Sequence, residues 1–206
     1  KETKNLYNIR IAPSNKNFIY LDNKYLLSKS DPNQENYDVI EFAKRNIRHA
    51  IIPSFIKIIS QRAFDQCQNL RRIEFLKDSQ LKRIEKYAFY STPIECIQFP
   101  KNIVEMANNA FSLCPYLKHI DFKKNENITL TIGKNAFHSN NLTSLTIPPQ
   151  CKSIENDAFI FCQNLEIIEF EHNKSNLISF TKSCFPKTEV KIMVPANLKI
   201  HKLISQ

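Results

Sequence analysis

The dipeptide Ala-Phe recurs at nearly even intervals, and this recurrence restricts the fold more than any other feature of the sequence. Successive phenylalanines of the series are 22, 25, 22, 26, 22 and 26 residues apart, so units of two alternating lengths follow one another. A fixed period of about 20 to 50 residues is typical of a solenoid, in which stacked units share one core. The series consists of Phe42, Ala63-Phe64, Ala88-Phe89, Ala110-Phe111, Ala136-Phe137, Ala158-Phe159 and Cys184-Phe185.

Further apolar positions keep step with the phenylalanines. An isoleucine or a methionine stands five residues before the phenylalanine of each Ala-Phe pair, at Ile59, Ile84, Met106, Ile132 and Ile154. The longer units continue through a cysteine and a leucine to Ile-x-Phe, as in Cys67, Leu70, Ile73 and Phe75, whereas the shorter units end in proline, as at Pro53, Pro100 and Pro148. So many coincident positions indicate one repeated structural unit.

Two segments of the unit predict different local structures. The Ile-x-Phe end alternates apolar and polar residues, which is typical of a strand with one buried face. The stretch that leads into Ala-Phe-x-x-Cys has the spacing of a short helix, with room for one or two turns. The sequence therefore predicts an α/β leucine-rich-repeat solenoid with a parallel β-sheet and short helical turns. At about 4.8 Å per rung, seven rungs give an array roughly 34 Å long.

The two ends of the chain differ from the repeats. Residues 18–21 and 25–27 flank Asp22-Asn23-Lys24, a pattern that predicts a β-hairpin. An open stack needs a cover on its first rung, so we expect residues 1–36 to form an N-terminal cap. Residues 37–206 then form the repeat array of about seven units, and the last of these, with Val190, Ile192 and Val194, is a degenerate capping unit.

The composition excludes several classes of protein. Gly133 is the single glycine, so neither a P-loop nor a dinucleotide-binding fingerprint can be present. No apolar run approaches the roughly 20 residues of a membrane-spanning helix. No signal peptide is visible, but the chain begins at Lys1 without a methionine, so this says little about its compartment.

The repeat pattern resembles that of the BspA-like leucine-rich-repeat family, in its protist-type branch. The carriers are three stretches with the pattern Ile-x-x-x-Ala-Phe-x-x-Cys-x-x-Leu-x-x-Ile-x-Phe, at Ile59–Phe75, Met106–Phe122 (with methionine first) and Ile154–Phe170. The chain departs from the usual Ile-Gly opening except at Ile132-Gly133. The resemblance implies a surface or secreted protein for adhesion, although many members lack an export signal.

The six cysteines are expected to be mostly free and directed into the core. Cys67, Cys114 and Cys162 occupy one position of the repeat in every second rung, about 10 Å apart, whereas a disulfide needs less than about 7 Å between Cα atoms. Free thiols suit a reducing compartment without proving one. No cysteine pair has the spacing of a zinc knuckle.

Catalytic and metal sites find little support in the sequence. His119 and Asp121 would point to the same side of a strand, either as a metal or acid–base pair or as solvated surface residues, and the second interpretation is favoured. A Cys114–His119 catalytic couple is disfavoured because Cys114 belongs to a structural position. We therefore expect no enzymatic activity, no metal and no cofactor.

The outward side of the parallel sheet is the predicted binding surface, on the concave side of the solenoid. It would be lined by Arg72, Glu74, Gln98, His119, Asp121, Thr146 and Glu169, with Cys96, Ser144 and Ile167 in the same rows. This face mixes charges and offers no aromatic platform, so protein recognition fits better than nucleic-acid binding, which is not excluded.

Positive charge forms a second candidate surface. The net charge of +9 is concentrated at the two ends of the array, in residues 41–87, where 11 Lys and Arg stand against 5 Asp and Glu, and in residues 181–206, where 5 Lys stand against 1 Glu. Such a field could steer an acidic partner, or it could only keep the chain soluble, and the second interpretation is favoured because the charges follow no single-face period. The basic cluster comprises Lys44, Arg45, Arg48, Arg71, Lys82 and Arg83.

Two functions remain open on the sequence alone. The first is a protein-binding module at the cell surface, or secreted, for adhesion or for interaction with a host or matrix, as the resemblance implies. The second is an intracellular scaffold or a component of a larger assembly in the cytoplasm, which the free cysteines, the missing export signal and the basic ends favour.

Overall fold

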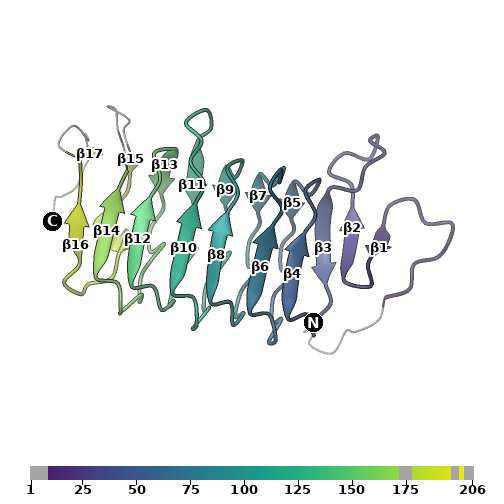
Figure 1. The fold of residues 1–206 in the computed structure, drawn as a ribbon, viewed down its shortest axis with the longest axis horizontal. Coiled ribbons are helices and arrows are strands. Elements are labelled where there is room, and N and C mark those ends of the chain that lie inside the picture. Colours follow the sequence, from purple (N-terminus) through teal and green to yellow (C-terminus); the bar gives the residue numbers. More distant parts are fainter. Residues whose placement is uncertain (1–8, 172–177, 196–199, 202–206) are drawn as a thin grey trace.

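A computed structural model describes residues 9–171, 178–195 and 200–201, and it shows a solenoid of stacked rungs (Figure 1). Each rung places one strand in each of two layers, and the layers face one another across the core. Neighbouring strands within the array are parallel, as the sequence predicts. The rungs run from the purple N-terminal end to the yellow C-terminal end of Figure 1.

One layer is formed by two sheets that lie end to end. A four-stranded sheet has the order β10-β8-β6-β4 and a three-stranded sheet the order β12-β14-β16. Their strands coincide with the predicted Ile-x-Phe segments and their equivalents. The bounds are β4 (His49–Ile52), β6 (Arg72–Phe75), β8 (Cys96–Phe99), β10 (His119–Phe122), β12 (Ser144–Ile147), β14 (Ile167–Phe170) and β16 (Lys191–Met193).

The other layer is a ten-stranded sheet that the sequence did not predict. Its order is β1-β2-β3-β5-β7-β9-β11-β13-β15-β17, and it contains the isoleucine or methionine that precedes each Ala-Phe pair. Most of its strands are very short. The bounds are β1 (Ile19–Leu21), β2 (Tyr25–Ser28), β3 (Val39–Ala43), β5 (Ile58–Ile59), β7 (Arg83–Ile84), β9 (Glu105–Met106), β11 (Leu130–Ile132), β13 (Cys151–Ile154), β15 (Ile178–Ser179) and β17 (Ile200–His201).

The segment around each Ala-Phe pair forms consecutive turns instead of a helical turn. Along this segment, every second backbone N–H group donates to a carbonyl of its own rung, as Cys67 N does to Phe64 O at 3.1 Å. The N–H groups between them donate to carbonyls of the next rung, as Phe64 N does to Ala88 O at 2.7 Å. Arg62 and Gln66 have φ near +60°, which ends a right-handed helix within one turn. The same two positions are left-handed in each full rung, at Tyr87 and Ser91, Asn109 and Leu113, Asn135 and Ser139, and Asp157 and Phe161.

The predicted α/β class is therefore wrong in its helical part. The described residues contain one 3₁₀-helix, η1 (Lys182–Cys184), and no α-helix. The physical reason is that the turns must give every second N–H group to the neighbouring rung, and an α-helix would keep those groups for itself. The fold is a β-solenoid of about six turns, with parallel sheets on its two sides.

The phenylalanines form one continuous stack through the core. Phe64, Phe89, Phe111, Phe137, Phe159 and Phe185 follow one another with ring centroids 4.6, 4.8, 5.4, 5.3 and 5.8 Å apart and with nearly parallel planes. The paired alanines are fully buried beside them. Cys184-Phe185 thus belongs to the series, as predicted. Phe42 does not, because it is half-buried under the Arg45 guanidinium, and Tyr25 of the hairpin packs against Phe64 in its place.

The predicted N-terminal hairpin is present. Strands β1 and β2 pair antiparallel, with Ile19 opposite Leu27, and β2 pairs antiparallel with β3. The strands are connected by Asp22, Asn23 and Lys24; Asp22 and Asn23 both have φ of 51°, and Lys24 N donates to Leu21 O at 2.9 Å across this left-handed turn. The hairpin continues the ten-stranded sheet beyond the first rung (Figure 1). The division into a cap of residues 1–36 and an array of residues 37–206 stays a prediction.

A buried carboxylate fastens the loop before β3 to the first rung. Asp38 accepts hydrogen bonds from Ser30 N and Oγ at 2.8 Å each and from Gln34 Nε2 at 2.6 Å, and Lys57 Nζ lies 3.0 Å from its second oxygen. Burial alone would raise the pKa of Asp38, but the hydrogen bonds from Ser30, Lys57 and Gln34 outweigh burial, and the pKa is lowered.

We expect Asp38→Asn to lower the free energy of unfolding at pH 7 by about 1 to 3 kcal/mol, the usual loss for hydrogen bonds to a charged group. Because the folded pKa lies below the unfolded one, the ionised carboxylate stabilises the fold above about pH 4 and loses this effect as the pH falls further. Urea unfolding of both proteins between pH 7 and pH 3 measures the difference, which should shrink below pH 4. The exposed Asp78→Asn is the control, and an equal loss in both variants would contradict this role for Asp38.

Candidate protein-binding face

The strands of the four- and three-stranded sheets turn every second side chain to the outside. Burial follows the order exposed, buried, exposed, buried in β4, β8, β10 and β14, whereas Phe75 of β6 is half-buried and all three residues of β16 are exposed. Two outward rows therefore run along the solenoid, and we call them together the outer face. The first outward row is His49, Arg72, Cys96, His119, Ser144, Ile167 and Lys191, and the second is Ile51, Glu74, Gln98, Asp121, Thr146, Glu169 and Met193.

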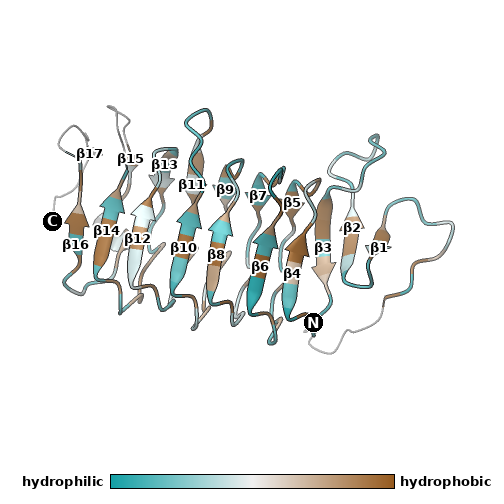
Figure 2. Cartoon of the chain, in the orientation of Figure 1, coloured by the Kyte–Doolittle hydropathy of each residue, from teal (hydrophilic) through white to brown (hydrophobic). Residues whose placement is uncertain are grey.

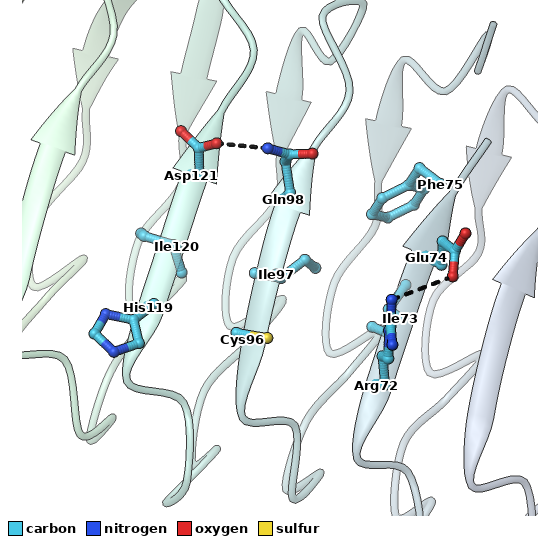
Figure 3. A pocket seen from close by; sticks show the side chains of 10 residues that line it. All are labelled: Arg72, Ile73, Glu74, Phe75, Cys96, Ile97, Gln98, His119, Ile120 and Asp121. Atoms are coloured by element: carbon cyan, nitrogen blue, oxygen red, sulfur yellow. Dashed lines mark hydrogen bonds and ion pairs between the residues drawn. The ribbon is translucent and has the colours of Figure 1, made fainter. Parts of the chain in front are cut away.

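The predicted binding residues all lie in these rows. Cys96 stands between Arg72 and His119 in the strand register, and Gln98 stands opposite Asp121. Figure 3 shows these side chains projecting from three neighbouring strands. The sequence therefore placed the members of the outer face correctly between β6 and β14; their role in binding stays a prediction. It missed the end positions His49, Ile51, Lys191 and Met193, because the first and last units lack the full repeat pattern.

Polar contacts link side chains along and between the strands of the outer face. Glu74 Oε2 lies 3.4 Å from His49 Nε2 and 3.6 Å from Arg72 Nη2, and Gln98 Nε2 donates to Asp121 Oδ2 at 2.7 Å. Their side chains are largely exposed, so each contact contributes little to stability. The residues from Arg72 to Asp121 border a shallow depression of about 320 Å³ whose floor includes Ile73, Ile97 and Ile120. A depression this open suits contact with a macromolecule better than enclosure of a small substrate.

Of the two catalytic arrangements considered from the sequence, the structure brings His119 and Asp121 to one side of a strand but separates Cys114 from His119. His119 and Asp121 do project from the same side of β10, on the exposed surface. Cys114 lies in the core, where its thiol is within 3.4 Å of Thr92 Oγ1 and 3.3 Å of Phe89 O, and burial raises its pKa to about 11. His119 is exposed, so the two residues form no couple. Among the described residues, no group of three metal-ligating side chains comes together.

All six cysteines are free thiols, and five of them are buried. The position three residues after each phenylalanine is occupied in turn by Cys67, Thr92, Cys114, Asn140 and Cys162. At three of these positions the side chain donates to the phenylalanine carbonyl of the preceding rung, from Cys114 to Phe89, from Asn140 to Phe111 and from Cys162 to Phe137, whereas Thr92 donates to Phe89 O of its own rung. Burial raises the pKa of Cys151 and Cys162 to about 12. Cys96, at the centre of the outer face, is the exposed thiol.

The predicted basic cluster does not form one surface. Arg45 is buried: its guanidinium donates to Ala63 O at 2.8 Å and lies 4.2 Å from the centre of the Phe42 ring. It therefore joins the end of β3 to the turn of the following rung and is not available on the surface. The sequence around Arg45 does not reveal its burial, because nothing in a run of basic residues indicates which side chain points into the protein. The remaining members divide between the half-buried Lys44 after β3, the exposed Arg48 and Arg71 before β4 and β6, and the exposed Lys82 and Arg83 on the ten-stranded sheet.

Tyr116 is a surface feature that the sequence did not reveal. Its ring lies 5.0 Å from the Arg71 guanidinium, at the edge where strands β6 and β10 begin. The residue is exposed, next to the first outward row. The local sequence Cys114-Pro115-Tyr116-Leu117 contains no signal for such a pair, because Arg71 belongs to an earlier unit.

Comparison with known proteins decides the family. Residues 39–130 and 130–202 match the BspA type leucine-rich repeat region, in six copies. The chain belongs to the BspA-type leucine-rich repeat family. Members of this family are repeat proteins of the protein-interaction type. The match covers the array from β3 onward and confirms the resemblance noted from the repeated Ala-Phe units.

Solved structures of related proteins agree with this fold. The chain is 30% identical to the pneumococcal vaccine antigen PcpA, with a TM-score of 0.57 over 62% of this chain and 32% of PcpA. A leucine-rich repeat protein of T. pallidum is 20% identical, with a TM-score of 0.60 over 75% of this chain and 77% of that one. The chain thus spans about a third of the length of PcpA. No curated protein matches it in sequence.

Within the residues that the structure describes, no helix is long and apolar enough to cross a membrane.

Proposed function

We propose that this BspA-type leucine-rich repeat chain is an adhesion module that binds another protein through its outer face. The observation that carries the proposal is the outer face itself, in which strands from β4 to β16 present exposed charged, amide and apolar side chains on one side of a rigid sheet. A surface of this kind is broad and preformed, so little ordering entropy is lost when a partner docks. Catalysis is not part of the proposal.

We further propose that this binding serves adhesion at the cell surface. It is supported by the similarity to PcpA, which is described as a vaccine antigen and is 30% identical over part of the chain. The second candidate is an intracellular scaffold, and the observation that favours it is the set of six free thiols, which suits a reducing compartment.

Cys96 offers a direct test of the binding face. It is the exposed thiol at the centre of the outer face, whereas the other five cysteines are buried, so a maleimide carrying a photoactivatable cross-linker should attach there. We expect light to join the labelled protein to a partner present in extracts of the source cells, and we expect Arg72→Ala with Asp121→Ala to abolish the product. The matched control carries Cys96→Ser with Glu105→Cys, which moves the probe to the exposed side of β9 in the ten-stranded sheet.

The outcomes separate the alternatives. Cross-linking from Cys96 but not from position 105 supports the outer face as the binding surface, and equal products from both positions, or none from Cys96, would refute it. On intact source cells, a membrane-impermeant maleimide should label Cys96 if the chain is displayed outside. Labelling that appears only after lysis would replace adhesion by the scaffold.

A further inference from the structure

The charges of the outer face are sorted by row, which the sequence alone does not make apparent. Arg72, Lys191 and the histidines His49 and His119 stand in the first outward row, and it contains no acidic residue. Glu74, Asp121 and Glu169 stand in the second outward row, and it contains no basic residue. Both statements cover strands β4 to β16, whose residues are all described. The first outward row therefore carries the positive charges of Arg72 and Lys191, and the second carries the negative charges of Glu74, Asp121 and Glu169.

The distance between the rows is that of two residues along a strand, about 6.6 Å. In β6 the basic residue precedes the acidic one by two positions, as Arg72 and Glu74, and β10 repeats this order as His119 and Asp121. A second sheet with the same order, laid antiparallel over the first, places its basic row over the acidic row below and its acidic row over the basic row. The outer face is thus complementary to itself.

We infer that the outer face pairs with the outer face of a second copy of this chain, about a two-fold axis parallel to the solenoid. This inference rests on the proposed function, because it names the partner of the same surface. Rotation about that axis keeps each rung over its counterpart and reverses the strand direction. Arg72 of each copy then faces Glu74 of the other, His119 faces Asp121, and Cys96 faces Gln98.

Apolar side chains flank the charged centre on both sides. Ile51 on β4 is 42% exposed, and Ile167 on β14 and Met193 on β16 are 39% and 43% exposed. In Figure 2, in which inward residues are coloured as well, β6 and β10 are largely teal, β8 is tan and then teal, and β4 and β14 carry more brown. In the paired arrangement Ile51, Ile167 and Met193 lie over His49, Glu169 and Lys191 of the other copy, so these apolar side chains gain no apolar partner. Pairing then depends on the centre of the face, where Arg72 lies over Glu74 and His119 over Asp121.

The size of the face limits the strength of the pair. Strands of about four residues cover roughly 13 Å, and seven rungs at about 4.8 Å cover roughly 34 Å, so the footprint is on the order of 450 Å² on each copy. Stable complexes bury about 800 Å² on each partner, so the self-association should be weak, reversible and sensitive to salt.

A charge exchange between two variants tests the pairing. Arg72→Glu brings a second carboxylate over Glu74 of the other copy, and Glu74→Arg brings a second guanidinium over Arg72, so each variant alone should associate at least tenfold more weakly than the original chain. A mixture of the two restores opposite charges at both contacts, so its association should return to within about threefold of the original. Sedimentation velocity of the full chain at low salt, at concentrations up to several hundred micromolar, measures these values.

A second mixture, of Arg72→Glu with Asp121→Arg, controls for general attraction between oppositely charged variants. Asp121→Arg changes the net charge as much as Glu74→Arg does, but it leaves Glu74 in place. The carboxylate introduced by Arg72→Glu would therefore still face the Glu74 carboxylate, and this mixture should stay as weak as the single variants. Circular dichroism of each variant checks that the fold is kept, and recovery in the first mixture cannot come from misfolded protein.

The possible results fall on either side of the inference. Self-association of the original chain, its loss in both single variants and its recovery in the matching mixture alone support it. A chain that stays monomeric at all concentrations, single variants that associate like the original, or recovery in both mixtures would overturn it. If pairing fails while Cys96 still cross-links to another protein, the proposed function stands and the identity of the partner is wrong.

Discussion

Replacing Phe111 by alanine is expected to lower the free energy of unfolding by about 3 to 5 kcal/mol, the usual cost of removing a buried phenylalanine. Phe111 is fully buried at the middle of the stack, with the Phe89 ring 4.8 Å away on one side and the Phe137 ring 5.4 Å away on the other. Phe99 of strand β8 makes an edge contact with the Phe111 ring, with the two ring centroids 5.4 Å apart. The shorter side chain leaves a cavity that neighbouring rungs cannot close, because each is held at the strand spacing by hydrogen bonds to the next.

A matched phenylalanine exists on the surface. Phe161 is 55% exposed, and its ring meets only the edge of His138 at 5.3 Å among the ring contacts of the described residues. We expect Phe161→Ala to change the free energy of unfolding by about 0.5 kcal/mol or less, as surface substitutions usually do. Urea unfolding followed by circular dichroism measures both variants. Equal losses would show that the stack contributes no more than an ordinary surface ring.

The fold could be predicted from the sequence only in the parts where a residue's neighbours in the chain are also its neighbours in the structure. The strand of each Ile-x-Phe segment is long enough for alternation to show, so Ile73, Ile97 and Ile120 were placed inside and Arg72 and His119 outside. The Ala-Phe stack follows in the same way from the period of the repeat. Both predictions need only the pattern within one unit and the assumption that units stack.

The second sheet and the turns could not be predicted, for two physical reasons. Strands such as Arg83–Ile84 have two residues, and alternation cannot be recognised over so short a length. None of the left-handed turn positions that the structure describes carries glycine, the usual signal. Asn109, Asn135 and Asp157 are of types that favour this geometry, but most of the other positions carry residues with no such preference, such as Arg62, Tyr87 and Leu113. What holds them left-handed is hydrogen bonding to the next rung, a contact about 24 residues away that local spacing does not reveal.

The same limit applies to the outer face. Its members could be assigned from alternation, but their arrangement into a basic and an acidic row depends on the register between strands. A shift of register by two residues would place Arg72 opposite Gln98 and remove the sorting of charge. Arg45 shows the reverse situation, because a basic residue expected on the surface is drawn inward by three backbone carbonyls.

Gly133 is the position where the stacking of rungs leaves no space for a side chain, and this gives the second large expected effect. A Cβ atom there would lie 2.8 Å from Met106 O, 2.9 Å from Ala107 C and 2.8 Å from Asn108 Oδ1. Two of these are backbone atoms of the preceding rung. The φ of Gly133 is not positive, so the glycine is required by close approach between rungs and not by its own conformation. Gly133 N donates to Met106 O at 2.7 Å, whereas the equivalent bonds from Glu85 and Ala107 are 2.9 Å long.

We therefore expect Gly133→Ala to lower the free energy of unfolding by about 1 to 3 kcal/mol, the usual cost of overpacking, although alanine is otherwise the more favourable residue. Ser60 occupies the same position of the repeat and already carries a Cβ atom, so Ser60→Ala is the control and should change stability by less than about 0.5 kcal/mol. Adding Asn108→Ala to Gly133→Ala removes the side-chain contact and leaves the two backbone contacts. Urea unfolding should then show only partial recovery, and full recovery would mean that the Asn108 side chain, and not the spacing of the rungs, excludes the methyl group.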